Sequence, residues 1–493
     1  MSSVKILPFS LIYQQIRENI LQGSMSVNTR YPGDSDENPS ILQLAITKND
    51  ICLINYLLKH KVDLNATSKC FEPALHLAIR LDSYELVRKL VEAGADVNVK
   101  QKFTDKLFRY TTIYPAVSEE IKKVIELLLE DKNNDNISLG EKGFFIAMGN
   151  ENFNPYDRVL DSGVDNLPVG DVVSPLHLAI QQNNYQIIEY LIANGADVDA
   201  NCNGATPLYV AVDKKYKDVI KLLIKNNAKV NVETRPKSLI HLLNWSSSFK
   251  IADILLDAGA DIDQDVDGTP LHHAIVSKLE SMVEYLINNG ADVNLKSNGM
   301  SCLHTALKSP NDKIINYLLM AGADVNVLNE KDTKVLDSTS SIFIGTPLKK
   351  SIKQHIVKLK AADFYLVRCN LEAVERDFDD YYRDCCREVD SLKQKKIPET
   401  HLSYYDVLRK NNFKLALALK NCRINFTNTV LESTFPLYGK IVGFKLYRAM
   451  KTKEYLNTAS ELLYNVFYGK LPDVVVREIA EYFSLSNLRM MSL

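Results

Sequence analysis

Tryptophan and net charge are the two features in which this 493-residue sequence is poorest. It has one tryptophan, and its 59 basic and 61 acidic residues give a formal net charge of -2 at pH 7. A charge this small provides no general attraction to nucleic acid or to an anionic membrane surface. No run of about 18 uncharged apolar residues is present, which argues against a transmembrane helix. We therefore expect neither nucleic acid nor membrane among the partners.

The apolar segment Ile6–Tyr13 does not fit a secretory signal peptide. Only Lys5 precedes it as a basic residue, and no small-residue cleavage site follows it. Ile12, Ile16 and Ile20 recur at four-residue spacing, which predicts a helix with one apolar stripe. We expect this helix to cover the first structural unit of the chain.

Cysteine pairs and catalytic motifs are also missing. None of the eight cysteines forms a Cys-x-x-Cys pair, so neither a disulfide framework nor a zinc site is expected. The adjacent Cys385 and Cys386 are predicted to lie on a helix with a buried face. The sequence lacks the Gly-x-x-x-x-Gly-Lys-Ser/Thr, His-Glu-x-x-His and Gly-x-Ser-x-Gly motifs. We expect no enzymatic activity, no cofactor and no metal ion.

What the sequence does contain is an internal repeat. A phrase close to Thr-Pro-Leu-His-Leu-Ala is followed about twenty residues later by Gly-Ala-Asp-Val-Asn, seven times along the chain. The glycine position recurs every 31 or 32 residues, at Gly195, Asn227, Gly259, Gly290 and Gly322. Thr269 and Pro270 are typical of a helix start, and Gly290 supplies the left-handed backbone that ends a helix.

The period, turn residues and helix signatures together resemble the ankyrin-repeat family, whose unit is a β-turn finger followed by two antiparallel helices. A unit this small buries its core only by stacking on neighbours. We therefore predict an all-α fold, an ankyrin-repeat solenoid of about ten helix-turn-helix repeats with β-turn fingers, plus a C-terminal helical domain. The expected parts are an N-terminal capping helix and loop at 1–35, ankyrin repeats at 36–365, a helical region at 366–462 and terminal helices at 463–493.

Two stretches of the array are expected to be divergent. At about 99–172, Val124–Glu130 and Val159–Asp165 match second-helix patterns, which favours two degenerate repeats there. At about 333–365 we expect a tenth, capping repeat whose first helix begins after Gly345.

Beyond the repeats, apolar residues from Leu371 to Leu392 alternate at three- and four-residue steps, which predicts one long amphipathic helix. Further helices are expected at 404–420, 437–450 and 454–467.

Five histidines occupy one position of successive repeats: His76, His177, His241, His272 and His304. Because the position recurs with the repeat, we expect these imidazoles to hydrogen-bond the backbone of a neighbouring turn rather than to bind metal or take part in catalysis.

The segment Asp263–Gly268 matches the first half of a calcium-binding loop, with carboxylates at positions 1, 3 and 5 and glycine at position 6. Position 12 requires a bidentate glutamate, and here it is Ala274. We expect an acidic finger tip rather than a calcium site.

The C-terminal segment Leu471–Phe483, followed by Ser484–Leu488, resembles the opening of an F-box, whose pattern is Leu-Pro-x-Glu-(three apolar)-x-Ile-x-x-Tyr-Leu. Pro472 can start a helix with one apolar face. The sequence departs from the pattern at Val474, in place of glutamate, and at Arg477, in place of an apolar residue. Both departures bear on affinity for the adaptor that an F-box binds.

Ankyrin repeats followed by helices and a terminal F-box-like motif resemble the poxvirus ankyrin proteins, whose C-terminal module is called PRANC. In that family the terminal motif recruits the host Skp adaptor and a cullin ubiquitin ligase, and the repeats select a host target. The resemblance implies that the Skp adaptor contacts Leu471, Pro472, Val475, Val476, Ile479, Tyr482 and Leu488.

The resemblance thus implies a viral substrate adaptor in the host cytoplasm, with the nucleus as a second location, that suppresses host antiviral or inflammatory signalling. Its host target is unidentified, and NF-κB and cell-death signalling are the expected pathways. The alternative is a stoichiometric inhibitor that masks a host protein without ubiquitin transfer. Finger tips vary where the scaffold imposes no residue, so we expect target contacts at Asn201, Asn203, Glu233, Arg235, Asp265, Asp267, Lys296, Asn298, Glu330 and Lys331.

Overall fold

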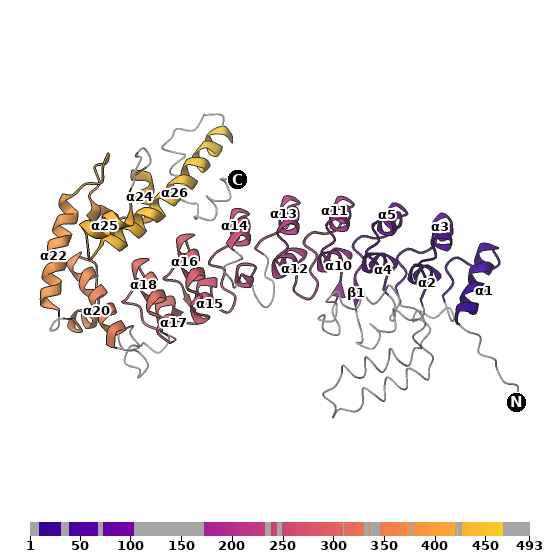
Figure 1. Ribbon diagram of the computed structural model, residues 1–493, viewed down its shortest axis with the longest axis horizontal. Coiled ribbons are helices and arrows are strands. Elements are labelled where there is room, and N and C mark those ends of the chain that lie inside the picture. Colours follow the sequence, from indigo (N-terminus) through magenta and orange to yellow (C-terminus); the bar gives the residue numbers. More distant parts are fainter. Residues whose placement is uncertain are drawn as a thin grey trace, which may run out of the picture. The chain divides into compact units, whose positions relative to one another are not determined.

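The computed structural model describes residues 9–30, 39–67, 72–102, 172–231, 238–243, 249–308, 310–329, 335, 346–374, 378–419, 422 and 426–466. Contacts divide the chain into two compact units, Met1–Lys229 (unit 1) and Val230–Leu493 (unit 2). Figure 1 labels the helices and strands of each unit.

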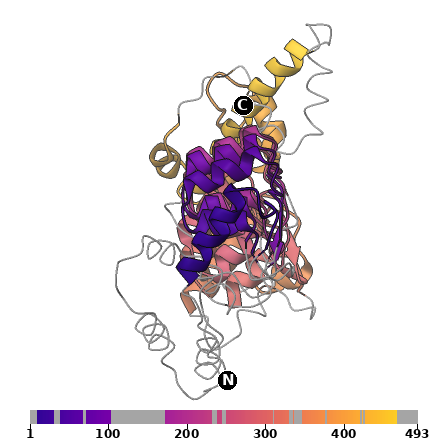
Figure 2. The same ribbon diagram turned by 90° about the vertical axis from the view of Figure 1, so that its right-hand side faces the viewer.

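Unit 1 is a row of antiparallel helix pairs preceded by the single helix α1 (Phe9–Leu21). The first helix of each pair has seven residues: α2 (Ile41–Thr47), α4 (Ala74–Arg80), α10 (Pro175–Gln181) and α12 (Pro207–Asp213). The second helix has nine residues: α3 (Ile51–Lys59), α5 (Tyr84–Glu92), α11 (Tyr185–Ala193) and α13 (Lys217–Lys225). The pairs lie side by side in Figure 1 and one behind another in the end-on view of Figure 2. This arrangement is the helix-turn-helix array that the repeated phrase predicts.

Capping and burial explain why such short segments are helical. Ser174 and Thr206 each accept a hydrogen bond from the backbone N–H three residues later, and a proline follows each at the first helical position. Leu178 of α10 and Ile188 of α11 are completely buried. A seven-residue helix is not stable alone in water, so packing between pairs, rather than helix propensity, stabilises each one.

Helix α1 packs against α3 at the start of unit 1. Its residues Ile16 and Ile20 are buried. Arg17 Nε donates to Asp50 Oδ2 at 2.7 Å, and Tyr13 OH donates to the same oxygen at 3.2 Å. Since Asp50 also caps the N-terminus of α3, one carboxylate joins α1 to the first helix pair.

The pair α4/α5 packs directly against the pair α10/α11. Between them the chain forms an antiparallel ladder of β1 (Gln101–Lys102) and β2 (Val172–Val173). His76 Nε2 donates to Val173 O at 3.1 Å. The two divergent repeats predicted for this interval fall on 103–171, outside the described residues. The described pairs on either side of the interval are neighbours in the stack.

The first part of unit 2 shows the same pattern with one irregular pair. The first helices are α15 (Pro270–Val276) and α17 (Cys302–Lys308), and the second helices are α14 (Phe249–Asp257), α16 (Glu280–Asn288) and α18 (Asp312–Met320). A three-residue 3-10 helix, η2 (Ile240–Leu242), stands where the first helix of the α14 pair is expected. Strands β3 (Lys296–Ser297) and β4 (Met300–Ser301) form the finger before α17.

The remaining described elements of unit 2 are α20 (Thr346–Ala361), α21 (Arg368–Glu372), α22 (Asp379–Gln394), α23 (Tyr404–Arg409), α24 (Asn412–Ala418), α25 (Asn428–Thr434) and α26 (Gly439–Val466). Helix α26 packs against α23, α24, α25 and α18. Lys451 Nζ of α26 donates to Asn289 Oδ1 at 2.8 Å, and Tyr438 OH donates to Lys358 O at 2.7 Å. These contacts place the helical region and the last repeats in one unit. No helix among the described residues is long and apolar enough to cross a membrane.

The single long helix predicted from Leu371 to Leu392 is wrong. The chain forms α21 and α22 instead, and Phe378 before α22 has a φ of -138°, which is not helical. Asp379 then starts α22, where an acidic side chain favours the positive end of the helix dipole. The expected buried face is present, since Cys385 is completely buried and burial raises the pKa of its thiol to about 11.

Three other helix predictions need correction. The helix predicted at 404–420 is two helices, because the side chain of Asn411 caps a new start at α24. The helices predicted at 437–450 and 454–467 are the single helix α26, since no glycine or proline interrupts the chain there. The tenth repeat predicted after Gly345 is one continuous helix, α20, rather than a pair, because no turn residue separates its two halves. Helix α25 was not predicted.

Candidate functional site

A histidine links a first helix to the finger that follows it in several described pairs, whereas Gln43 of α2 and Tyr209 of α12 occupy the same position in two others. Burial lowers the pKa of His177 to about 4, so its ring is neutral at pH 7. Its Nε2 donates to Ala205 O at 3.2 Å, and its Nδ1 lies 2.7 Å from Ser174 Oγ, which donates to it. The same partners recur in unit 2: Ser238 Oγ and Gly268 O for His241, and Thr269 Oγ and Met300 O for His272. The prediction that the histidines bond the backbone of a neighbouring turn is confirmed for these three. For His304, the bond to Ser301 Oγ at 2.8 Å is present, and its predicted bond to a turn stays a prediction.

His76 lacks one of these two partners. Pro73 occupies the position of the serine or threonine, and Nδ1 of His76 has no hydrogen-bond partner among the described residues. Its Nε2 still donates to Val173 O at 3.1 Å. One hydrogen bond therefore connects this histidine to its finger, whereas a hydroxyl and a backbone carbonyl both bond His177, His241 and His272.

An asparagine at the base of several fingers bonds the turn at the base of the finger that follows. Asn98 Oδ1 accepts from Asp197 N at 2.7 Å, and Asn98 Nδ2 donates to Gly195 O at 3.0 Å. The same two-bond pattern joins Asn231 to Asp261 N and Gly259 O, Asn294 to Asp324 N and Gly322 O, and Asn326 to Val367 N and Tyr365 O. The last of these bonds the chain that follows α20. A single helix thus takes the next position in the stack, where a capping repeat was predicted.

Two of these positions carry aspartate, Asp199 and Asp263. A carboxylate accepts the backbone N–H but has no proton for the glycine carbonyl. Burial raises the pKa of Asp263 to about 6, and the charges of Asp292 and Asp261 act in the same direction. The hydrogen bond from Asp292 N and the charge of Arg448 on α26 oppose them. A neutral side chain that can donate a hydrogen bond would therefore suit this position better than the carboxylate of Asp263 does.

Three of the predicted target contacts lie in tight turns. Asn203, Asp267 and Asn298 have φ values of 56°, 57° and 49°, and each precedes a glycine with positive φ. Asn203-Gly204 and Asn298-Gly299 each form the two-residue hairpin turn that Asn-Gly favours. At Asp267, Val266 N donates instead to Gly268 O at 3.3 Å. All three residues are exposed. The turn explains why these residue types occur, and it leaves their side chains at the surface.

Three further predicted contacts also bond their surroundings. Asp265 Oδ1 accepts from Ser297 Oγ at 3.0 Å, and Lys296 Nζ donates to Leu328 O at 3.1 Å. Asn201 Oδ1 accepts from a backbone N–H of its own turn at 2.8 Å. Asn201, Asp265 and Lys296 are nevertheless exposed. These bonds keep neighbouring finger tips in register.

The other predicted site residues lie outside the described part of the chain. They are Glu233, Arg235, Glu330 and Lys331 of the fingers, and Leu471, Pro472, Val475, Val476, Ile479, Tyr482 and Leu488 of the F-box-like segment. Their roles stay predictions.

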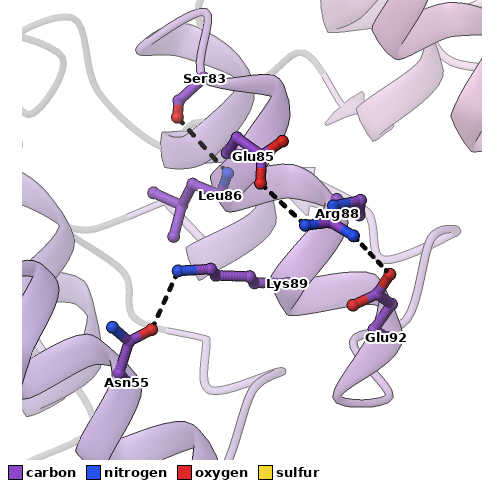
Figure 3. Close-up of polar contacts among 7 residues, drawn as sticks. All are labelled: Asn55, Ser83, Glu85, Leu86, Arg88, Lys89 and Glu92. Atoms are coloured by element: carbon purple, nitrogen blue, oxygen red, sulfur yellow. Dashed lines mark hydrogen bonds and ion pairs between the residues drawn. The ribbon is translucent and has the colours of Figure 1, made fainter.

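Second helices are also joined by side-chain hydrogen bonds that were not predicted from the sequence. Lys89 Nζ of α5 donates to Asn55 Oδ1 of α3 at 3.1 Å (Figure 3). In unit 2, Tyr285 OH of α16 donates to Asp253 Oδ1 of α14 at 2.7 Å. The donor and the acceptor occupy two adjacent positions of the repeat. Polar residues at both positions of aligned repeats are the signal that identifies these bonds.

Figure 3 also shows how α5 balances its own charges. The side chain of Arg88 lies between Glu85, at 2.9 Å, and Glu92, at 3.4 Å. Ser83 Oγ caps the helix by accepting from Leu86 N at 3.4 Å. The exposed basic residue of this helix therefore has acidic partners one turn away on either side.

Among the described residues, no group of three histidine, cysteine, aspartate or glutamate side chains is placed to hold a metal ion. The exposed groups of the repeats lie on turns and on helix faces. Packing between neighbouring helix pairs fixes the backbone positions of both.

Comparison with known proteins gives the following relatives. An ankyrin repeat protein of fowlpox virus is 28% identical over 171 residues, which cover 32% of this chain and 49% of that protein. An ankyrin repeat protein of Acanthamoeba polyphaga mimivirus is 28% identical over 113 residues, or 23% of this chain and 14% of that protein. The nuclear factor NF-kappa-B p105 subunit of Gallus gallus is 25% identical over 271 residues, or 53% and 21%. The matches span less than half the length of each relative.

The family described as ankyrin repeats (3 copies) matches residues 14–101, 44–141, 144–234 and 240–329. These matches extend over more than half of the chain. They coincide with the helix pairs, the histidine-to-finger bonds and the asparagine bridges described above. The chain belongs to the ankyrin-repeat family.

Proposed function

We propose that this chain is a viral substrate adaptor. Its repeats hold a host protein, and its C-terminal segment from Leu471 recruits the host Skp adaptor and a cullin ubiquitin ligase. In this proposal the chain catalyses nothing itself. Holding the target beside the ligase replaces a bimolecular encounter with a high effective concentration. The expected outcome is suppression of antiviral or inflammatory signalling, in the host cytoplasm and, as a second location, the nucleus.

The observation that carries the proposal is the set of exposed finger tips. Asn203 and Asn298 lie in two-residue turns, and Asp267 has the same left-handed backbone, so their side chains start from defined backbone positions. Preorganised contacts lose less conformational entropy on binding than flexible ones do. Such a surface suits recognition of a folded protein, which is the use that ankyrin arrays serve.

The choice of partners draws on the comparisons and on the sequence. Similarity to an ankyrin repeat protein of fowlpox virus supports a viral protein. Similarity to the NF-kappa-B p105 subunit supports a search for the target in NF-κB signalling, beside the cell-death pathways. Recruitment of the Skp adaptor is supported by the F-box-like residues from Leu471 to Leu488 alone.

Co-purification from avian and mammalian host cells tests the ligase half of the proposal. Tagged wild type is expected to recover the Skp adaptor and a cullin. The double variant Leu471→Asp/Ile479→Asp is expected to recover at least about tenfold less of both, because two apolar anchors of the motif become charged. Circular dichroism and thermal unfolding establish that the variant keeps the wild-type fold.

The matched control adds the same two carboxylates elsewhere. Thr429 and Val430 on α25 are exposed, so Thr429→Asp/Val430→Asp is expected to recover both ligase subunits at wild-type levels. A folded wild type that recovers neither subunit in any host cell contradicts the adaptor proposal. If that preparation still recovers a host target, the chain acts as the stoichiometric inhibitor.

The finger half is tested by changes that keep the turn. Asp267→Asn and Asn298→Asp alter charge at the tips while retaining residue types that tolerate the left-handed backbone. We expect either change to reduce recovery of the target by about threefold to tenfold, without reducing recovery of the Skp adaptor. Unchanged recovery with both changes combined removes these two tips from the binding surface.

A further inference from the structure

The exposed face of α13 differs from that of every other second helix in the described array. Its first, fifth and ninth residues are Lys217, Lys221 and Lys225, and all three are exposed. No other described second helix carries more than one basic residue at these three positions. With the exposed Lys214 and Lys215 just before the helix, they make up the α13 lysine row.

Within the described residues, no side chain of the α13 lysine row makes a hydrogen bond or an ion pair. Charged side chains at the same helix positions of α5 and α16 do have such partners. Arg88 of α5 lies between Glu85 and Glu92, and Glu280 of α16 accepts from Asn311 and Lys313. The nearest exposed acidic residues in sequence, Asp213 and Asp218, leave the row with a clear positive excess.

Local stability does not account for these lysines. Lys217 lies at the N-terminus of α13, where the helix dipole disfavours a cation. Lys217, Lys221 and Lys225 repeat at four-residue spacing, which places like charges beside one another. Only Lys225, in the last turn, is favourably placed with respect to the dipole.

The turn before the helix also departs from local preference. Lys215 has a φ of 61°, in a left-handed turn position that Asp82, Asn183 and Lys278 occupy in other pairs. Asparagine and aspartate tolerate this backbone better than lysine does. Tyr216, at the N-cap of α13, makes no side-chain capping bond, and neither does Leu279 at α16, whereas Asn184 caps α11. Because α16 shares these two departures, it is the repeated lysines along the helix that set α13 apart.

We propose that the α13 lysine row is a docking surface for an acidic segment of a partner protein. One helical stripe spaces its charges about 6 Å apart. A partner helix with carboxylates at every fourth residue has the same spacing, so its charges and those of Lys217, Lys221 and Lys225 meet in register. The complementary charge also relieves the repulsion within the row.

Two other occupants fit less well. The row has no arginine, the residue that binds phosphates bidentately, and the aromatic side chain beside it, Tyr216, is half-buried. In a second copy of this chain, no described second helix has acidic residues at all three of the matching positions. Glu280 and Asp253, which lie at such positions, already bond Lys313 and Tyr285. A foreign acidic segment is therefore the occupant.

This surface goes beyond the proposed function, because it involves neither the finger tips nor the segment from Leu471. The two proposals fail separately. Loss of acidic-peptide binding leaves recovery of the Skp adaptor unchanged, and loss of the adaptor leaves peptide binding unchanged.

Fluorescence anisotropy with the full chain tests the proposal. The probe is a labelled helical peptide with glutamate at every fourth position, and its counterpart has glutamine at those positions. We expect the glutamate peptide to bind, the glutamine peptide not to bind, and added salt to weaken binding. The triple variant Lys217→Glu/Lys221→Glu/Lys225→Glu is expected to lower affinity at least about tenfold, since three pairs become repulsive.

The matched control changes net charge equally at three exposed lysines of other helices, Lys59→Glu/Lys250→Glu/Lys414→Glu, and is expected to stay within about twofold of wild type. A second variant, with glutamine at the three α13 positions, provides the test should the glutamate variant unfold. Equal binding of the glutamine peptide overturns the proposal, as does equal loss in the control. Tighter binding of a single-stranded DNA oligonucleotide through the same lysines also overturns it.

Discussion

The finger between α5 and α10 and the finger between α16 and α17 share one geometry but differ in the length of chain that closes them. In the short finger, Asn298 and Gly299 form the whole turn. In the long finger, Gln101 pairs with Val173. This pair occupies the same position as the two residues that flank the Asn-Gly turn of the short finger. Residues 103–171 complete that connection.

Both fingers are nevertheless attached to the preceding first helix in the same way. His76 Nε2 donates to Val173 O at 3.1 Å, and His272 Nε2 donates to Met300 O at 3.1 Å. The comparison teaches that the stack is determined by contacts at the base of a finger. Loop-closure entropy grows only slowly with length, so a long connection at the tip is compatible with the same base.

Removing the histidine that bonds each of these two fingers has the largest expected effect on stability. His272→Ala is expected to lower the free energy of unfolding by about 3 kcal/mol and His76→Ala by about 2 kcal/mol. The difference arises because Thr269 Oγ also bonds His272, whereas Nδ1 of His76 has no described partner. Urea unfolding measures both, with the exposed His60→Ala as control. Equal losses contradict the proposed role of the second bond.

The aspartate at the base of the finger before α15 gives a pH-dependent prediction. The folded pKa of Asp263 is raised to about 6 from 3.8, so its folded state binds a proton more tightly than its unfolded state. Its contribution to stability is therefore greatest below pH 3.8 and is lost as pH rises through 6. Asp263→Asn supplies the missing donor and is expected to add about 1–2 kcal/mol at neutral pH, allowing for partial solvent screening.

The measurement is the difference in unfolding free energy between wild type and Asp263→Asn at several pH values. That difference is expected to widen from acidic to neutral pH. Asn294→Asp provides the reverse change at the base of the short finger, and is expected to destabilise the chain at neutral pH and less so in acid. A difference that does not vary with pH refutes the assignment of a raised pKa to Asp263.

Substitution within the short turn has a smaller expected effect. Asn298 has a φ of 49°, so Asn298→Ala is expected to lower the free energy of unfolding by about 1 kcal/mol. Asn298→Gly is expected to be nearly neutral, because glycine adopts this backbone without strain. Chemical denaturation distinguishes the two. A larger loss for glycine than for alanine means that the side chain, and not the backbone conformation, matters at this position.

Converting the long finger into a short one is expected to change stability least. Replacing Lys102 to Val172 by Asn-Gly gives Gln101 and Val173 the turn that joins Cys202 to Ala205 in unit 1. We expect the same helical signal per residue and an unfolding free energy that is unchanged or higher, because a shorter connection costs less closure entropy. Circular dichroism and urea unfolding provide the check. Failure to fold means that 103–171 support the stack.

Much of the repeat could be predicted because its signals are local. Ser174 and Thr206 with their prolines mark helix starts, and the shared histidine position correctly indicated a bond to a neighbouring turn. The finger tips were also predicted. The sequence did not reveal that the left-handed backbone of the turn determines the residue type at Asn203 and Asn298.

The misses lie where local signals compete or where contacts are distant. Apolar spacing continues through Phe378 and concealed the break between α21 and α22. The predicted break between 450 and 454 is absent, since Lys451 bonds Asn289 and the helix continues. The unpaired charge of the α13 lysine row became visible only when the partners of other second helices were known.

The sequence by itself determined the helix pairs, their caps and the finger turns, because these depend on residues within a few positions of one another. Only the tertiary structure decided which pairs are neighbours. The regular period predicts two divergent repeats between Gly94 and Gly195, on residues outside the described part, and it did not reveal that Asn98 bonds Gly195 O directly. A periodic sequence specifies how one unit attaches to the next, and the packing of complementary faces selects which unit that is.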